Sequence, residues 1–150
     1  MKIAVLGAGA WGTALAASAA ARHDVVLWAR DPAQAQALRQ TRRNERYLEG
    51  AELPAAITVH SDLAAASAHA RQGLAVIAAP MSGLRECLRA LAAQGPAIWV
   101  SKGFEAGTGA LGHEVARDER PHAAAGVLSG PSFAVEVARG QPTAVVAAST

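Results

Sequence analysis

Three glycines near the N-terminus have the spacing of a phosphate-binding turn. They are Gly7, Gly9 and Gly12 in the stretch VLGAGAWGTALAAS, which includes the end of a short apolar run. In a strand–turn–helix unit the first glycine permits a tight turn, the second lets the backbone approach a pyrophosphate, and the third lets the helix lie close to the strand. The amide groups that begin the helix then face the anion, aided by the helix dipole. The motif predicts a dinucleotide site; the alternative is a set of glycines that serve only the turn.

The residues at the end of the second expected strand bear on which dinucleotide is bound. NAD-specific sites place an acidic residue there to accept hydrogen bonds from the ribose hydroxyls. This chain reads VVLWARD, with Ala29 or Arg30 at that position and Asp31 next. An arginine pairs with a 2′-phosphate or stacks on adenine. Asp31 followed by Pro32 is typical of a helix start, and the alternative is a carboxylate that reaches the ribose. We expect NADP(H) or NAD(H) as the cofactor, with NADP(H) favoured.

Further polar groups follow three later expected strands. The stretches AAPMSG, SKGFE and LSGPSFA each lie at the end of an apolar run. In a doubly wound sheet such points share one edge, the carboxyl ends of the strands, where ligands bind. Lys102 in SKGFE is therefore placed to meet an anionic group, and the alternative is an ordinary surface charge.

The segment LSGPSFA combines a turn with a helix start. Gly130 and Pro131 shape the turn, and Ser132 precedes an expected helix over residues 133–139. The Ser132 hydroxyl has two compatible roles. It caps this helix, or it donates a hydrogen bond to a ligand.

Short apolar runs alternate with longer alanine-rich helical stretches along the chain. The expected strands are residues 2–6, 24–28, 57–60, 74–78, 97–101, 126–128 and 143–148. The expected helices are residues 11–22, 32–42, 62–70, 82–93, 110–117 and 133–139. Several strands are nearly continuous in Val, Ile and Ala, as in strands that are buried on both faces of a parallel sheet. This alternation predicts an α/β fold with a doubly wound, mostly parallel sheet of the Rossmann type.

One stretch and one cluster lie outside this alternation. Residues 44–55, NERYLEGAELPA, form the longest irregular piece, and connections of about a dozen residues are often functional. Four arginines lie in and just before this stretch, namely Arg39, Arg42, Arg43 and Arg46. We interpret them as a solvated helix end, and the alternative is contact with an anionic ligand.

Composition and charge exclude several classes of protein. The chain has 150 residues, the size of one domain, and 51% of them are hydrophobic. A net charge of +2, without a dense basic stripe, argues against a nucleic-acid binder. The sequence shows no signal peptide, and no apolar run approaches the ~20 residues of a membrane span. We expect a cytoplasmic protein without membrane insertion.

The cysteine and the histidines do not indicate catalysis. Cys87 has no partner for an internal disulfide and lies in the helical pattern GLRECLRALAAQ, so we interpret it as a small buried hydrophobe. The five histidines lie near strand ends, in helical stretches or in a polar loop, and we interpret them as surface or hydrogen-bonded side chains rather than bases. We expect no metal site.

Together these motifs resemble one family, the bacterial NAD(P)-dependent glycerol-3-phosphate dehydrogenases. The matching stretches are GAGAWGTALA (residues 7–16), LWARD (27–31), NERYL (44–48), SKGFE (101–105) and LSGPSFAVEVARGQPTAVV (128–146). The last stretch is the most specific, because a generic Rossmann domain has no reason to contain it. The chain departs from the family pattern at Ala10, where serine is common, and at Glu49, where proline is usual.

The resemblance implies a set of ligand-binding residues. Besides the three glycines, the residues that it assigns to the dinucleotide site are Ala10, Trp11, Arg30, Tyr47 and Lys102, with Ala134 as a further contact. The residues that it assigns to the glycerol phosphate are Lys102, Gly130 and Ser132. Lys102 thus belongs to both sets.

The resemblance also implies a reaction, reversible hydride transfer between the nicotinamide and sn-glycerol 3-phosphate, which gives dihydroxyacetone phosphate and supplies phospholipid precursors. Family members place the general acid/base lysine in a helical C-terminal domain, which corresponds to sequence beyond Thr150. We therefore expect residues 1–150 to form the NAD(P)-binding domain with part of the substrate phosphate site. We expect no catalytic residue among them, no turnover by these residues alone, and a homodimer in the complete enzyme.

Two other functions stay open on the sequence alone. One is another two-domain NAD(P)-dependent reductase of the hydroxyacid or ketopantoate type, although SGPSFA after SKGFE counts against it. The other is a non-catalytic dinucleotide-sensing module, which the lack of a catalytic domain also fits.

Overall fold

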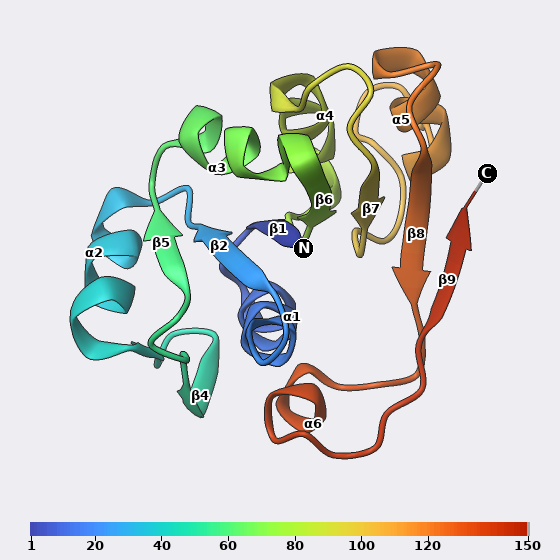
Figure 1. Ribbon diagram of the computed structural model, residues 1–150. Coiled ribbons are helices and arrows are strands. Elements are labelled where there is room, and N and C mark those ends of the chain that lie inside the picture. Colours follow the sequence, from blue (N-terminus) through green and yellow to red (C-terminus); the bar gives the residue numbers. More distant parts are fainter. Residues whose placement is uncertain (150) are drawn as a thin grey trace.

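A seven-stranded sheet forms the centre of the computed structural model, which describes residues 1–149. The strands lie in the order β5 (Thr58–His60), β2 (Asp24–Trp28), β1 (Lys2–Leu6), β6 (Gly73–Ile77), β7 (Ala97–Trp99), β8 (Ala125–Ser129) and β9 (Val146–Ser149). Neighbours from β5 to β8 are parallel, and β9 is antiparallel to β8. The chain leaves β1 toward β2 and returns on its other side with β6 (Figure 1). This confirms the doubly wound, mostly parallel sheet.

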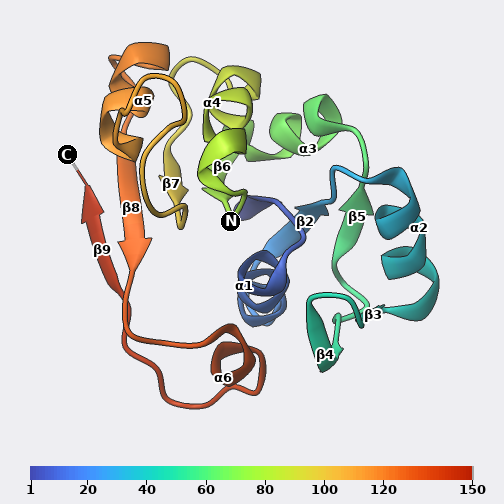
Figure 2. The same cartoon turned by 180° about the vertical axis from the view of Figure 1, so that it is seen from behind.

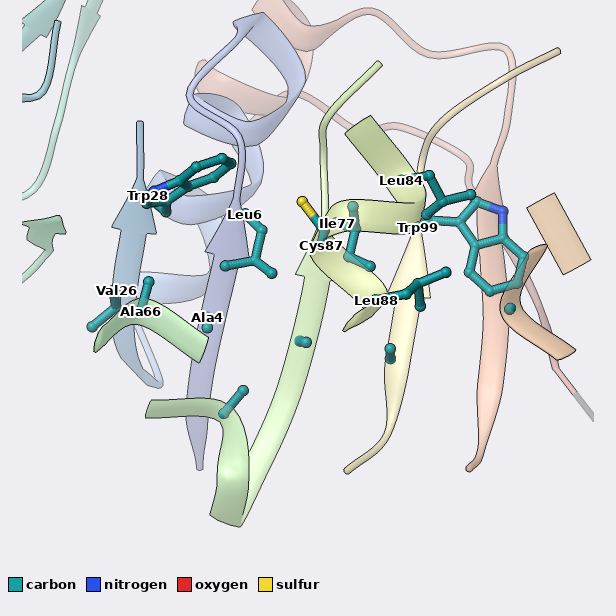
Figure 3. Close-up of a cluster of buried hydrophobic side chains, with 14 of the residues drawn as sticks. Ala4, Leu6, Val26, Trp28, Ala66, Ile77, Leu84, Cys87, Leu88 and Trp99 are labelled. Carbon is teal, nitrogen blue, oxygen red and sulfur yellow. The ribbon is translucent and has the colours of Figure 1, made fainter. Parts of the chain in front are cut away.

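Helices cover both faces of this sheet. They are α1 (Ala10–Ala20), α2 (Pro32–Thr41), α3 (Leu63–His69) with the following 3₁₀ turn (Ala70–Gln72), α4 (Met81–Ala90) and α5 (Gly112–Glu119). A further helix, α6 (Ala134–Ala138), packs on α1 instead. One buried cluster joins side chains of α3, α4 and α5 to the sheet (Figure 3), and a second joins α1 and α2 to its other face. The layers therefore have the helix–sheet–helix arrangement expected of parallel strands.

The central strand β1 shows why its sequence is apolar at successive positions. Ala4 and Leu6 belong to the cluster on one face, and Ile3 and Val5 to the cluster on the other. Successive side chains of a strand point to opposite faces, so a strand with helices on both sides needs apolar residues throughout. All four residues are at most 5% exposed.

The stretch expected to be irregular, residues 44–55, is instead largely a β-hairpin. Strands β3 (Arg43–Asn44) and β4 (Leu48–Glu52) pair antiparallel, with a shift of register between them. Leu48 and Asn44 are both buried, Leu48 in a small cluster with Ala14 of α1 and Ala134 of α6. The expectation was wrong because burial of these two residues against distant segments, rather than a local alternating pattern, fixes the hairpin.

Some element ends differ from the expected ranges. Helix α5 starts after Leu111, whose amide donates to Glu114 Oε2 at 2.8 Å, and it continues to Glu119. Strand β9 starts at Val146 rather than residue 143, because the preceding segment crosses from α6 to the edge of the sheet. Helix α6 lies beside α1, away from the strand that follows it (Figure 2).

Within residues 1–149, the helices are all too short or too polar to cross a membrane.

Candidate functional site

A cleft of about 690 Å³ lies at the carboxyl ends of β1, β2, β6 and β7. It lies where the chain reverses direction between β1 and β6, the usual ligand site of an open parallel sheet. Residues 7–11, 30–31, 78–81 and 100–102 form much of its wall, and side chains of α2, α4 and the segment after β3 also line it. The sequence motifs that follow these strands therefore meet at one place, as expected.

The three glycines have different surroundings. Gly7 has a φ of +122°, and a Cβ there would lie 2.6 Å from the Ala78 carbonyl oxygen. A Cβ on Gly12 would lie 1.8 Å from the Gly7 carbonyl oxygen, so only glycine allows the helix to approach the turn this closely. A Cβ on Gly9 would meet no atom within 4 Å. Gly9 therefore faces open space, and its lack of a side chain leaves that space free for a ligand.

The N-terminus of α1 has no side-chain cap, because the residue at the cap position is Gly9, which has no side chain. The amides of Ala10, Trp11 and Gly12 have no acceptor within the helix, because the first turn of any α-helix lacks them. By contrast, Asp31 and Asp62 cap α2 and α3 through hydrogen bonds of 2.9 Å. The residues present fit a bound pyrophosphate, since uncapped amides and the positive end of a helix dipole border empty space.

Two amide side chains hold the glycine turn in place. Gln34 Nε2 donates to the Ala8 carbonyl oxygen at 2.7 Å, and Asn44 Nδ2 donates to the same oxygen at 2.9 Å. Asn44 also donates to Thr13 Oγ1 of α1 at 2.7 Å. Asn44 is 2% exposed, so these bonds are shielded from water. Asn44 lies in the stretch NERYL, where a lone polar residue in an apparently irregular segment gives no signal of this role.

Two arginines, Arg30 and Arg46, line the cleft together with the carboxylates of Asp31 and Glu86. Arg30, Arg46 and Tyr47 all border it, and the Arg46 guanidinium lies 5.0 Å from the centre of the Tyr47 ring. Asp31 also borders it, but its Oδ1 accepts the hydrogen bond from the Ala33 amide, which confirms the expected helix cap. Arg30 and Asp31 are both exposed, and Asp31 uses Oδ1 for this cap.

The arginine cluster separates into different roles. Arg39 Nε donates to a backbone carbonyl of β5 at 2.9 Å, and Arg42 Nη2 bonds two carbonyls of the segment before β5. Arg43 lies 4.0 Å from Glu45 at the surface. Arg46 alone of the four borders the cleft. Arg39 and Arg42 therefore tie the end of α2 to β5 and to the segment before it, and Arg46 faces the candidate site.

A second cavity, of about 170 Å³, adjoins the first. Leu128, Ser129, Gly130 and Val145 line it, and it shares Trp11, Val100 and Lys102 with the larger cleft. The structure thus brings Lys102 and Gly130 together across 28 residues of sequence, at the boundary between the two spaces. An ammonium group at this boundary can reach an anion in either cavity.

Ser132 and Ala134 border neither space in this structure. Ser132 Oγ donates to the Ala144 carbonyl oxygen at 2.8 Å, and the residue before α6 is Phe133, whose amide donates to Glu136 Oε2 at 3.0 Å. The expected cap by Ser132 is therefore wrong, because its hydroxyl serves the turn into β9. Ala134 is buried against α1 and the hairpin. The ligand contacts of these two residues stay predictions.

Cys87 lies in α4 at one wall of the cleft and is 1% exposed, as expected of a small buried hydrophobe. Burial raises the pKa of its thiol to about 12, so the reactive thiolate is scarce at neutral pH. Among residues 1–149, neither cavity is lined by a histidine, and no group of three or more His, Cys, Asp or Glu is placed to hold a metal.

Comparison with known proteins gives a consistent result. The family model described as "NAD-dependent glycerol-3-phosphate dehydrogenase N-terminus" matches residues 2–150. A glycerol-3-phosphate dehydrogenase [NAD(P)+] of Methylibium petroleiphilum is 65% identical over 100% of this chain and 46% of its own length. One of Leptothrix cholodnii is 56% identical over 99% of this chain and 48% of its own length. The chain thus spans about half the length of these curated relatives.

A solved structure agrees with these relatives. The crystal structure of a glycerol-3-phosphate dehydrogenase from Coxiella burnetii superposes with a TM-score of 0.89 at 34% identity, covering 98% of this chain and 46% of that one. This match includes the sheet, the glycine turn and the segment through α6 to β9. The chain therefore belongs to the NAD-dependent glycerol-3-phosphate dehydrogenase family, whose N-terminal part it matches.

Proposed function

We propose that this chain binds NADP(H) or NAD(H) in the large cleft, with the pyrophosphate at the N-terminus of α1. The observation that carries the proposal is the empty space beside Gly9, bordered by amides that no side chain caps. Gln34 and Asn44 fix the turn that presents these amides. The names of the relatives, glycerol-3-phosphate dehydrogenase [NAD(P)+], agree with this ligand class.

We further propose that NADP(H) binds more tightly than NAD(H). Arg30 and Arg46 both border the cleft, and their guanidinium groups suit a 2′-phosphate. Asp31, the acidic residue that follows β2, accepts a backbone hydrogen bond at Oδ1, so part of its accepting capacity serves the cap of α2 rather than a ribose hydroxyl. Each charge-assisted hydrogen bond to the phosphate contributes about 1.5–3 kcal/mol, or a factor of roughly ten or more in affinity.

The substrate is proposed to be glycerol 3-phosphate or dihydroxyacetone phosphate, as in the family. Lys102 borders both cavities, so its ammonium group can hold a phosphate in the smaller one while it faces the dinucleotide in the larger. Gly130 leaves no room for a side chain, since a Cβ would lie 2.5 Å from the Ala144 carbonyl oxygen. The nicotinamide, when bound, supplies the hydride chemistry.

We propose that the acid or base for the substrate hydroxyl proton lies outside residues 1–149, with Lys102 serving to hold the phosphate. No histidine lines either cavity of residues 1–149, and Cys87 stays protonated at neutral pH. We propose that residues 1–150 are the NAD(P)-binding domain and that a lysine in a helical second domain transfers this proton. That domain corresponds to the half of the relatives' length that this chain does not match. A cytoplasmic homodimer that supplies phospholipid precursors completes the proposal.

The experiment is a pair of titrations of this chain, one with NADPH and one with NADH. Binding is monitored by tryptophan fluorescence, because Trp11 and Trp28 line the cleft. We expect NADPH to bind more tightly, and Arg30→Ala to weaken NADPH about tenfold while changing NADH little. Arg22→Ala, an exposed arginine after α1, is the matched control. Equal weakening of both cofactors by Arg30→Ala would remove the 2′-phosphate assignment. Steady-state reduction of dihydroxyacetone phosphate by these 150 residues alone would disprove the proposal that the proton donor lies in a second domain.

A further inference from the structure

An ion-pair cluster lies behind the segment that carries Lys102. Arg85 of α4 donates hydrogen bonds to both carboxylate oxygens of Glu105, from Nε to Oε1 at 2.6 Å and from Nη2 to Oε2 at 2.7 Å. Thr108 Oγ1 donates to Glu105 Oε2 at 2.7 Å. The Glu105 side chain is 13% exposed. A bidentate ion pair of this kind fixes the relative orientation of the two side chains as well as the distance between them.

The backbone around Glu105 is also tied down. Its amide donates to the Ala110 carbonyl oxygen at 2.8 Å, and its own carbonyl accepts from the Gly109 amide at 2.9 Å. At the other end of the segment, Ser101 Oγ donates to the Ala79 carbonyl oxygen at 2.7 Å. Residues 101–105 are therefore anchored at both ends to residues 79–85, the stretch that forms a wall of the cleft and starts α4.

Lys102 lies between these two anchors. It is exposed, and the next residue, Gly103, has a φ of +94° that bends the chain back toward the Glu105 anchor. A lysine has a long flexible side chain, so its reach into the two cavities depends on where its backbone is held. Losing the Arg85–Glu105 pair removes the side-chain anchor at one end of this short segment and leaves only the backbone bonds of Glu105 to residues 109 and 110, which enlarges the volume that the ammonium group explores.

We propose that Glu105, held by Arg85, is a positioning residue that fixes Lys102 at the boundary of the two cavities. This inference rests on the proposed function, which makes Lys102 a ligand-binding residue. Glu105 touches neither cavity and acts through the backbone of residues 102–105.

The same cluster supplies a matched control. Arg85 also bonds Glu119 of α5, and Arg89 of α4 donates to both oxygens of Glu119 at 2.8 and 2.9 Å. The Arg89–Glu119 pair links two helices without touching the Lys102 segment. Hydrogen bonds from Arg85 and Thr108 lower the pKa of Glu105 to about 2, so its carboxylate stays charged throughout a neutral titration.

The test is a double-mutant cycle on this chain with NADPH as the probe. We expect Lys102→Met to weaken NADPH about tenfold and Glu105→Gln to weaken it about threefold to tenfold. In the Lys102→Met background we expect Glu105→Gln to have no further effect, because the lysine through which it acts is gone. Arg89→Met should leave the affinity unchanged. Arg85→Lys keeps the charge but loses the bidentate hydrogen bonds, so it should weaken NADPH binding as Glu105→Gln does. It replaces Glu105→Gln in the test if that variant fails to fold.

The outcomes separate this inference from the proposed function. If Lys102→Met leaves NADPH affinity unchanged, the proposed role of Lys102 fails. If Lys102→Met weakens binding but folded Glu105→Gln and Arg85→Lys bind as the unmodified chain does, the positioning role alone is overturned. Independent, multiplying effects in the double variant would also overturn it, since a purely structural role of Glu105 predicts that result.

Discussion

Asn44 is the residue whose removal tests most sharply how the hairpin supports the glycine turn. Asn44→Ala deletes two buried hydrogen bonds, to the Ala8 carbonyl oxygen and to Thr13 Oγ1. A neutral hydrogen bond contributes about 0.5–1.5 kcal/mol to stability, so the pair is worth about 2 kcal/mol. Ala8 keeps its bond from Gln34, which limits the loss on that side. In a domain of this size the change lowers Tm by about 4–8 °C.

The control and the refutation follow from the same geometry. Gln34→Ala removes one bond to Ala8 while Asn44 stays, so its free energy of unfolding should fall by about 1 kcal/mol or less. Urea unfolding gives both values, and NADPH titration should show the larger loss of affinity for Asn44→Ala, because the turn then loses its link to the hairpin. If Asn44→Ala is no less stable than Gln34→Ala, Asn44 does not anchor the turn as described.

Three further changes probe other parts of the structure. Gly12→Ala places a Cβ 1.8 Å from the Gly7 carbonyl oxygen, so we expect urea unfolding to show a loss of several kcal/mol or more in the free energy of unfolding. Near-normal stability would contradict the close approach of the turn and the helix. With its pKa raised to about 12, Cys87 should react with iodoacetamide at pH 8 far more slowly in the folded chain than in urea, and equal rates would show that it is accessible. Because the pKa of Glu105 falls from 4.5 to about 2 on folding, its ion pair contributes its full stability above pH 4.5, and this contribution is lost as the pH falls toward 2. Glu105→Gln should therefore make stability less dependent on pH in this range of an acid-unfolding curve. An unchanged curve would refute the pairing.

Local signals were enough to predict the centre of the fold. The run before Gly7 is apolar at every position because β1 is covered on both faces, and Asp31 with Pro32 marks a helix start through its own side chain and ring. The spacing of the three glycines is equally local, since Gly7 to Gly12 span six residues, although the Ala78 carbonyl oxygen that also excludes a Cβ at Gly7 is distant in sequence. The apolar run, the helix start and the glycine spacing are patterns among neighbours in sequence, which is why the sequence reveals them.

Features that depend on distant partners were missed. Asn44 becomes important only through Ala8 and Thr13, which lie 36 and 31 residues away. Glu105 depends in the same way on Arg85 of α4. Nothing in the stretches around these residues indicates which distant group each one meets, so their roles emerge only with the fold.

Ser132 shows a different kind of limit. A serine directly before an expected helix is typical of a cap, and here the following residue, Phe133, takes that position. The Ser132 hydroxyl instead bonds the Ala144 carbonyl oxygen, in a segment that returns to the sheet after α6. The helix therefore starts one residue later than the serine indicates, and the hydroxyl forms a tertiary hydrogen bond instead of a cap.

The central claim is that the uncapped start of α1 beside Gly9 holds the pyrophosphate of a dinucleotide, and Gly9→Asp tests it most directly. A Cβ at this position meets no atom within 4 Å, and the φ of −77° suits any residue, so the variant should fold with an unchanged or higher Tm. Its carboxylate would occupy the space beside the α1 amides and repel the phosphates. We predict that the folded variant loses NADPH binding in a fluorescence titration. NADPH binding with undiminished affinity would contradict the site.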